Sequence, residues 1–239
     1  MTINIKGLTK RCKARIAVHQ LTLQIQQGEF FALLGQNAAG KTTTIKMLCG
    51  LLPTSEGDAI VDGKSIIQHP QAVKQMINIS PQETAVAPNL TVYENLLLIG
   101  QIYGYEKTEA QQQAQVQMDL FGLTTRRRDK AKTLSGGYQR RLSVAMALMS
   151  NPKVLFLDEP TLGMDIRARN ELWHILKQLK GNVTVVFTSH YLEEVEALAD
   201  RVGIMEKGQL RALGTVQQLI NETGKKSLEE VFLEKTEVR

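Results

Sequence analysis

Residues Phe30-Phe31-Ala32-Leu33-Leu34 form a continuous apolar run, and Gly35-Gln36-Asn37-Ala38-Ala39-Gly40-Lys41-Thr42 follows directly. Such a run predicts a central strand of a sheet, buried on both faces. The helical pattern of residues 41–48 begins where the glycine-containing segment ends. Strand, loop and helix in this order are the context of a P-loop, in which backbone N–H groups and the helix N-terminus hold phosphate oxygens. The sequence therefore predicts a phosphate site.

The last residues of this loop add the chemistry of a nucleotide site. Lys41 places a positive charge at the β- and γ-phosphates, and the Thr42 hydroxyl is suited to bind Mg²⁺. The alternative is a plain glycine-rich turn with an exposed lysine, and the adjacent Lys-Thr pair argues against it. The loop residues expected to contact the nucleotide are Gly35, Asn37, Ala38, Ala39, Gly40, Lys41, Thr42 and Thr43.

A second apolar run, Val154–Leu157, ends in Asp158 and Glu159. Ligands of open α/β sheets bind beyond the carboxyl ends of the strands. Asp158 is suited to hold Mg²⁺ through its water shell, and Glu159 to polarise a water that attacks the γ-phosphate. Two acids that cap the next helix or turn are the ordinary alternative, and the P-loop upstream argues against it.

A third motif, Leu134-Ser135-Gly136-Gly137-Tyr138, precedes an amphipathic helical pattern. Ser135 is suited to cap this helix, and small residues at a helix start need no function. A glycine pair also leaves N–H groups open to an anion, which the helix dipole favours. The residues by themselves leave both interpretations open.

Composition and charge limit the class of protein. The chain has 239 residues, 43% of them hydrophobic, and a formal net charge of +5. It contains no apolar run of about 20 residues, the length that spans a bilayer, so a cytosolic chain is expected. Cys12 and Cys49 fit neither zinc spacing nor a disulfide framework and are expected to be free thiols. The basic cluster Arg126-Arg127-Arg128 has no interleaved aromatic residues, so no nucleic acid is expected as a partner.

Secondary-structure signals around the motifs fall into three blocks. The first third predicts antiparallel, half-exposed strands and a hairpin near residues 57–63, and helical periodicity dominates residues 90–149. Strand, helix and strand then predict a βαβ crossover. The expected strands cover residues 3–8, 21–25, 30–34, 154–157, 183–187, 202–205 and 209–212, and the expected helices 41–48, 92–102, 109–121, 138–149, 168–179, 216–220 and 228–235.

The three motifs, in this order and at these separations, resemble those of ABC-transporter nucleotide-binding domains, and the resemblance covers nearly the whole chain. It implies an α/β fold with a RecA-like P-loop NTPase core, an antiparallel β subdomain and an inserted helical subdomain. A single ABC ATPase domain over residues 1–239 is expected, with the core and β subdomain at residues 1–87 and 151–239 and the helical subdomain at residues 88–150.

The resemblance also implies partners and a location. It implies a head-to-tail dimer that hydrolyses ATP with Mg²⁺, each ATP lying between one P-loop and Ser135, Gly136 and Gly137 of the other subunit. Whether the second ATPase subunit is identical stays open. A transmembrane permease subunit is expected to hold the dimer at the inner face of the cell membrane and to choose the cargo.

Three further residues match positions with known roles in the family. Gln82 stands where a glutamine contacts Mg²⁺ or water and joins the core to the helical subdomain. Asp165 matches an aspartate that communicates across the dimer, and it is equally suited to cap the following helix. His190 is expected to contact the γ-phosphate and to orient the attacking water.

Three residues depart from the family pattern. Cys12 lies at the approximate position of the tyrosine that stacks on adenine, Ala38 replaces a glycine, and Tyr138 replaces a glutamine. Ala38 strains the loop if its φ is positive. Base recognition is therefore the function that these departures put in question.

The segments around Ser135, His190 and residues 228–233 resemble those of exporter ATPases, so export is favoured over import. An ATPase that acts on ribosomes or DNA is a competing class, but those relatives typically carry two ATPase units or a long coiled coil. A pseudo-ATPase is disfavoured because Lys41, Asp158, Glu159 and His190 are all present.

Overall fold

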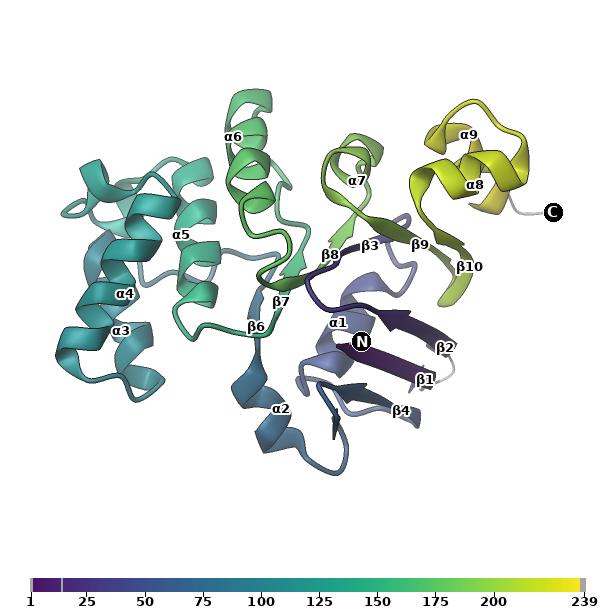
Figure 1. The fold of residues 1–239 in the computed structure, drawn as a ribbon, viewed down its shortest axis with the longest axis horizontal. Coiled ribbons are helices and arrows are strands. Elements are labelled where there is room, and N and C mark those ends of the chain that lie inside the picture. Colours follow the sequence, from purple (N-terminus) through teal and green to yellow (C-terminus); the bar gives the residue numbers. More distant parts are fainter. Residues whose placement is uncertain (1, 14, 237–239) are drawn as a thin grey trace.

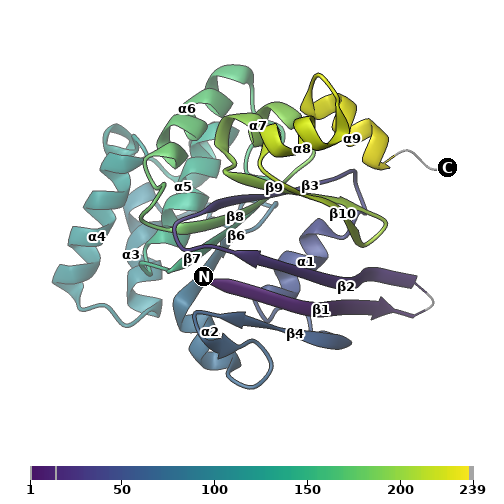
Figure 2. The same cartoon turned by 45° about the vertical axis from the view of Figure 1, so that its right-hand side comes forward.

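The computed structural model describes residues 2–13 and 15–236 and contains two β-sheets (Figures 1 and 2). A six-stranded sheet has the order β10-β9-β3-β8-β7-β6, and a four-stranded sheet has the order β2-β1-β4-β5. The strands are β1 (Ile3–Cys12), β2 (Arg15–Ile25), β3 (Phe30–Leu34), β4 (Glu56–Val61), β5 (Lys64–Ser65), β6 (Ile77–Ser80), β7 (Val154–Asp158), β8 (Thr184–Ser189), β9 (Arg201–Glu206) and β10 (Gln209–Gly214).

Helices cover both sheets. The α-helices are α1 (Lys41–Leu48), α2 (Pro70–Met76), α3 (Val92–Ile102), α4 (Lys107–Leu120), α5 (Gly136–Leu148), α6 (Ile166–Lys177), α7 (Leu192–Leu198), α8 (Val216–Thr223) and α9 (Leu228–Thr236). Two short 3₁₀ turns cover Thr124–Arg126 and Ala131–Thr133. Both views place α1 between the two sheets, and its buried Ile45, Met47 and Leu48 share one apolar cluster with residues of β1 and β3.

The larger sheet gathers the carboxyl ends of its central strands at one edge. β3 pairs in parallel with β8, so that Leu34 lies opposite Ser189, and β7 pairs in parallel with β8, so that Asp158 lies opposite Thr188. All five residues of β3 are buried, as its continuous apolar run predicts. The loops that follow β3, β7 and β8 therefore lie side by side, which is where an open α/β sheet binds its ligand.

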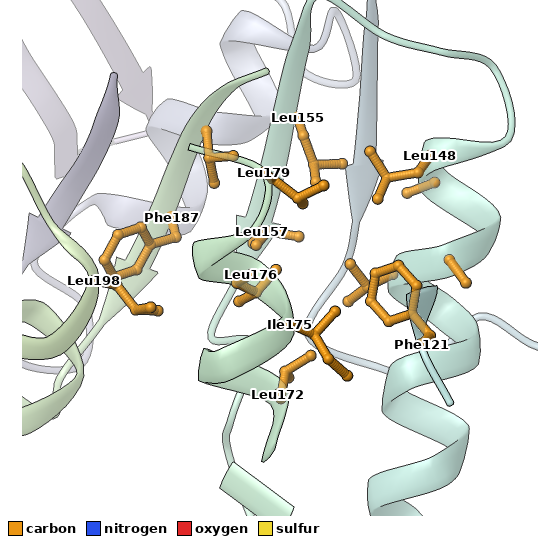
Figure 3. Packing of buried hydrophobic residues seen from close by; sticks show 14 of the residues in the cluster. Phe121, Leu148, Leu155, Leu157, Leu172, Ile175, Leu176, Leu179, Phe187 and Leu198 are labelled. Carbon is orange, nitrogen blue, oxygen red and sulfur yellow. The ribbon is translucent and has the colours of Figure 1, made fainter. Parts of the chain in front are cut away.

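The helices α3, α4 and α5 pack together at one end of the molecule, away from the four-stranded sheet (Figure 1). Thr91 and Glu94 form a capping box at the start of α3, and hydrogen bonds from the Thr91 backbone and side chain lower the pKa of Glu94. In Figure 3, Leu148 of α5 lies beside Leu155 of β7, and Ile175 of α6 lies below them, toward Phe121. This apolar layer joins the helical segment to the sheet.

Apart from the two 3₁₀ turns, the elements in residues 2–13 and 15–236 that the sequence patterns did not predict are α2, β6 and α7. β6 has only four residues and lies at the edge of the sheet, where its pairing with β7 specifies it. α7 carries Glu193, Glu194 and Glu196, which obscure its apolar face. The predicted free thiols are confirmed, with Cys12 exposed and Cys49 buried. Among the described residues, no helix is both long and apolar enough to cross a bilayer.

Candidate nucleotide site

A cleft of about 580 Å³ lies over the P-loop and is lined by residues from five separate parts of the chain. It brings together all the predicted loop residues except Gly35 with Gln82, Glu159 and His190, whereas Gly35 lines a neighbouring pocket with His190. Arg15 of β2 also lines it, and its guanidinium donates to the Ala38 carbonyl at 3.1 Å. The lining residues are Cys12, Arg15, Ala17, Asn37, Ala38, Ala39, Gly40, Lys41, Thr42, Thr43, Gln82, Glu159, Leu162 and His190.

Two glycines of the loop are required by close backbone contacts. A Cβ atom at Gly35 would lie 2.5 Å from the Met205 carbonyl oxygen, and one at Gly40 would lie 2.6 Å from the Ala17 carbonyl oxygen. Ala38 adopts φ +65°, the left-handed region that favours glycine. The loop of this chain therefore holds one strained alanine where the family pattern has glycine.

Lys41 lies at the centre of the cleft and is 5% exposed. Its ammonium donates to the carbonyl oxygens of Gly35 at 2.7 Å and Gln36 at 3.2 Å, and its Nζ lies 3.2 Å from Oε1 of Glu159. The other carboxylate oxygen of Glu159 lies 2.8 Å from Nδ1 of His190. One carboxylate thus joins the lysine of the loop to the histidine beyond β8.

Asp158 lies beneath this group and is 3% exposed. Its Oδ1 accepts hydrogen bonds from the hydroxyls of Thr42 at 2.9 Å and Thr188 at 2.6 Å. The Thr42 hydroxyl and the Asp158 carboxylate are therefore adjacent, and oxygen donors of this kind are the ligands that Mg²⁺ prefers. Gln82 is exposed and adds an amide oxygen to the same cleft. These residues fit a Mg²⁺ ion bound together with phosphate.

The backbone after β7 is held from two sides. Arg140 of α5 donates from Nη2 to the Asp158 carbonyl and from Nε to the Pro160 carbonyl, both at 2.8 Å. From α7, the buried Glu194 accepts hydrogen bonds from the side chains of Thr161 at 2.9 Å and Trp173 at 3.2 Å. Burial raises the pKa of Glu194, and hydrogen bonds from its neighbours act in the opposite direction.

Arg140 keeps its charge in this environment. Burial lowers its pKa to about 10, while the nearby carboxylates of Asp158, Glu194 and Glu159 act in the opposite direction. The guanidinium is therefore still protonated at neutral pH. Arg140 and Thr188 were not predicted as site residues from the sequence. Thr188 adjoins the predicted Ser189-His190 segment, whereas the repeated basic residues of α5 indicate only an exposed helix face.

The third motif lies apart from this cleft within one chain. Ser135, Gly137 and Asp165 line a separate pocket of about 260 Å³ together with Tyr138 and side chains of α6. Ser135 precedes α5 without a side-chain capping bond, whereas Asp165 caps α6 by accepting from the Ala168 N–H at 2.9 Å. Gly136 is exposed, and a Cβ atom there would meet nothing within 4 Å. The N-terminus of α5 is therefore accessible.

Comparisons with known proteins agree with this arrangement. A family described as ABC transporter matches residues 18–162. The linearmycin resistance ATP-binding protein LnrL of Bacillus subtilis is 41% identical over 223 residues, which cover 93% of this chain and 72% of LnrL. The human phospholipid-transporting ATPase ABCA3 is 38% identical over 217 residues, which cover 89% of this chain but 13% of ABCA3.

A solved structure described as the ATP binding subunit of an ABC transporter superposes with a TM-score of 0.88 at 26% identity, covering 99% of this chain and 100% of that one. The largely parallel six-stranded sheet and its phosphate loop define a P-loop nucleotide-binding protein. Within that class, the chain belongs to the ABC transporter family and is one of its ATP-binding ATPases. The predicted family and the predicted RecA-like α/β fold are confirmed.

Proposed function

We propose that this chain is the ATP-hydrolysing subunit of an exporter, working as a dimer that closes around ATP and moves a separate permease. The observation that carries the proposal is the Lys41, Glu159 and His190 group at the mouth of the P-loop, where Glu159 lies 3.2 Å from the Lys41 ammonium and 2.8 Å from the His190 imidazole. A base, a cation and an orienting histidine are the groups that attack of water on a phosphate requires.

Lys41 is the residue that responds first to the nucleotide. Its ammonium is bonded to two backbone carbonyls and to Glu159. The oxygens of a γ-phosphate are charged acceptors, which make stronger hydrogen bonds to an ammonium than neutral carbonyls do. Transfer of Lys41 to the phosphate frees Oε1 of Glu159 to accept a hydrogen bond from water. ATP binding and activation of the base are thus linked through one side chain.

His190 and Glu159 then act as a pair. While Glu159 is ionised, the contact to Oε2 places the proton of His190 on Nδ1, because the carboxylate only accepts. Nε2 of His190 is left to contact the phosphate or the attacking water. The positive φ of Glu159, +48°, is a strained backbone conformation that the surrounding hydrogen bonds maintain. Both groups are therefore held in place before substrate arrives.

Thr42, Asp158 and Gln82 are the residues that would hold Mg²⁺, which would supply positive charge to neutralise the β- and γ-phosphates. The protein contributes the oxygen donors and their orientation. Thr188 fixes Asp158 by donating to its Oδ1 at 2.6 Å, so this carboxylate is oriented from β8.

The dimer follows from the separation of the two anion sites. The N-terminus of α5 presents Gly136 and its neighbouring N–H groups outside the cleft that holds Lys41. A helix N-terminus with free N–H groups favours a negative charge. In a head-to-tail dimer, Ser135, Gly136 and Gly137 of one subunit complete the site over the P-loop of the other, with Asp165 beside them.

Export is supported by the relatives. LnrL is described as a linearmycin resistance ATP-binding protein and ABCA3 as a phospholipid-transporting ATPase, and we infer export of the cargo from these two descriptions. A groove of about 240 Å³ beside the Gln82 segment supports a membrane partner at the inner face of the cell membrane. Ile79, Ile99 and Met146 line it, and Ile102 at its edge is 68% exposed. We assign this groove to a cytoplasmic helix of the permease.

A photo-cross-linking side chain at the exposed positions Glu83 or Asn89 is expected to capture a polytopic membrane protein in cells. Both positions lie on the segment between β6 and α3, which also contributes Pro81 and Ala85 to the groove. The matched control is the exposed position Gln217 on α8, at the opposite end of the molecule (Figure 1), which should give no such product. Mass spectrometry that finds only ribosomal proteins attached to Glu83 and Asn89 contradicts the proposal.

Base recognition is expected to be weak. Cys12 lines the cleft without a flat ring, and stacking on an aromatic ring is worth about 1–3 kcal/mol per base. Cys12→Tyr should therefore bind ATP about tenfold more tightly in a Glu159→Gln background that blocks turnover. Titration with ATP and GTP measures both affinity and preference.

Tyr138→Gln serves as the comparison for this test. Tyr138 lies across the proposed dimer interface, with the guanidinium of Arg141 5.1 Å and that of Arg126 5.6 Å from its ring centroid. Weaker ATP binding by Tyr138→Gln alone would show that the ring supplies a contact in trans. If both substitutions leave the affinities and the base preference unchanged, the alignment of Cys12 with the base is wrong.

A further inference from the structure

Arg140 contacts the backbone on both sides of Glu159. Its guanidinium donates to the carbonyls of Asp158 and Pro160, the residues before and after the strained Glu159. These two bonds span the residue whose φ is +48°. A sparsely populated backbone conformation persists only where the surrounding structure over-determines it. Arg140 therefore supplies part of the support that keeps Glu159 in its place.

The same guanidinium reaches the segment after β6. Nη1 donates to the carbonyl of Pro81 and lies 3.4 Å from the carbonyl of Gln82. One rigid fork thus joins the residues that follow β6 to the residues that follow β7. The planar guanidinium fixes the relative positions of its acceptors, because its five N–H donors point in set directions.

Arg140 also belongs to the helix that carries the third motif. It lies in the first turns of α5, five residues after Ser135, and is 5% exposed. A buried charge is costly without its hydrogen-bond partners. If α5 shifts relative to the sheet, the carbonyls bonded to Arg140 must therefore move with it, or these hydrogen bonds break. The position of Ser135 and the position of Glu159 are therefore mechanically connected inside one chain.

We propose that Arg140 is a positioning residue for hydrolysis: it fixes Glu159 relative to Gln82 and transmits the docking of Ser135 on a neighbouring subunit's nucleotide to the base of its own subunit. The inference rests on the proposed role of Glu159. Arg140 itself does not line the cleft over the P-loop. Its loss acts on the rate through Glu159 and leaves the groups that bind ATP unchanged.

Arg140→Gln removes the positive charge and most of the N–H donors while keeping a polar side chain. The purified chain is expected to lose about 10²-fold in kcat, the effect of a small misplacement of a reacting group, with the KM for ATP changed by less than about threefold. Arg140→Lys keeps the charge but cannot span both pairs of carbonyls, so it should recover only part of kcat. Wild-type kcat in a folded Arg140→Gln or Arg140→Lys variant overturns the proposal.

Arg201→Gln is the matched control for lost stability. Like Arg140, Arg201 joins separate parts of the chain and does not line the cleft, but its acceptors are the Glu29 carboxylate, with Oε1 at 3.1 Å, and the Gln24 carbonyl at 3.2 Å. It should lower Tm and leave kcat near the wild-type value. If Arg201→Gln lowers kcat as much as Arg140→Gln at an equal loss of Tm, the effect is general destabilisation and the proposal fails.

A double-mutant cycle separates this inference from the proposed function. In the Glu159→Gln background, Arg140→Gln should lower the residual rate of ATP hydrolysis by less than about threefold. The reason is that Arg140 is proposed to act by positioning the Glu159 carboxylate, which this background lacks. Equal factors in both backgrounds overturn the positioning role. Near-normal hydrolysis by Glu159→Gln alone instead overturns the assignment of the base, whatever Arg140→Gln does. Should Arg140→Gln fail to fold, Arg140→Lys takes its place in the cycle.

Discussion

Glu159→Gln is expected to bind ATP normally and to lose between about 10²- and 10⁴-fold in turnover, the usual effect of removing a general base. Glutamine keeps the size of the side chain and one acceptor oxygen, so His190 retains a partner near the 2.8 Å contact of the carboxylate. It cannot take a proton from water. Steady-state release of phosphate by the purified variant measures the loss.

The same variant should accumulate a dimer in the presence of ATP and Mg²⁺, because closure occurs and hydrolysis does not release it. Size-exclusion chromatography with and without ATP shows the shift. Glu193→Gln is the control: Glu193 is an exposed carboxylate that pairs with Arg169 at 2.8 Å on the surface. It should hydrolyse ATP at the wild-type rate. Near-normal hydrolysis by Glu159→Gln contradicts the role of Glu159.

Lys41→Ala is expected to lose most ATP binding, and mixing it with Ser135→Arg should restore hydrolysis. Truncating one member of a buried, hydrogen-bonded charge pair costs about 2–5 kcal/mol, which corresponds to a loss in affinity of about 30-fold or more. Ser135 and Lys41 line different pockets of one chain. In a mixed dimer, one composite site receives both substitutions and the other receives neither.

The measurement is ATP hydrolysis by each variant alone and by an equimolar mixture after subunit exchange. The mixture of Lys41→Ala with Glu159→Gln is the control, because both changes lie on the P-loop half and each site of that mixed dimer keeps one of them. It should stay inactive. Absence of rescue in the first mixture, once exchange has been shown by labelled subunits, contradicts the composite site.

Continuous apolar runs and glycines made the centre of the fold predictable from the sequence. The structure places β3, β7 and the loop before α1 where the sequence patterns predict them. A strand that is buried on both faces needs apolar side chains at every position, so it can be recognised as a continuous apolar run. At Gly35 and Gly40 a Cβ atom would lie less than 3 Å from a backbone atom, so only glycine fits. The glycines of the loop are therefore visible in the sequence itself.

Short elements specified by tertiary pairing were not predictable. β6 alternates weakly and is determined by its register with β7, from Ile77 opposite Val154 to Ser80 opposite Leu157. α5 begins at Gly136 rather than Tyr138, because Ser135 already has the extended backbone of an N-cap. Helix propensity disfavours glycine at these positions, and the first turn forms in spite of it.

The site was predictable as a set of residues but not as a network of bonds. The motifs singled out Lys41, Asp158 and Glu159, and the family resemblance added His190. The structure places Lys41, Glu159 and His190 along the lining of one cleft, with the buried Asp158 bonded to Thr42. Thr188 and Arg140 act through hydrogen bonds to partners 30 and 18 residues away. Such contacts depend on the packing of β8 and α5, which no local pattern encodes.

Every acceptor that Arg140 reaches is a main-chain carbonyl, at residues 81, 82, 158 and 160. A main-chain acceptor survives any change of side chain that leaves the backbone path intact. The two ends of this connection therefore differ in how they tolerate mutation: a changed side chain at position 81 or 160 keeps its carbonyl acceptor if the backbone path is unchanged, whereas replacement of Arg140 removes all the bonds at once. The carbonyl oxygens only accept hydrogen bonds, so they cannot replace the donors that are lost with Arg140. A homologue without this arginine needs another donor side chain to connect the segments after β6 and β7.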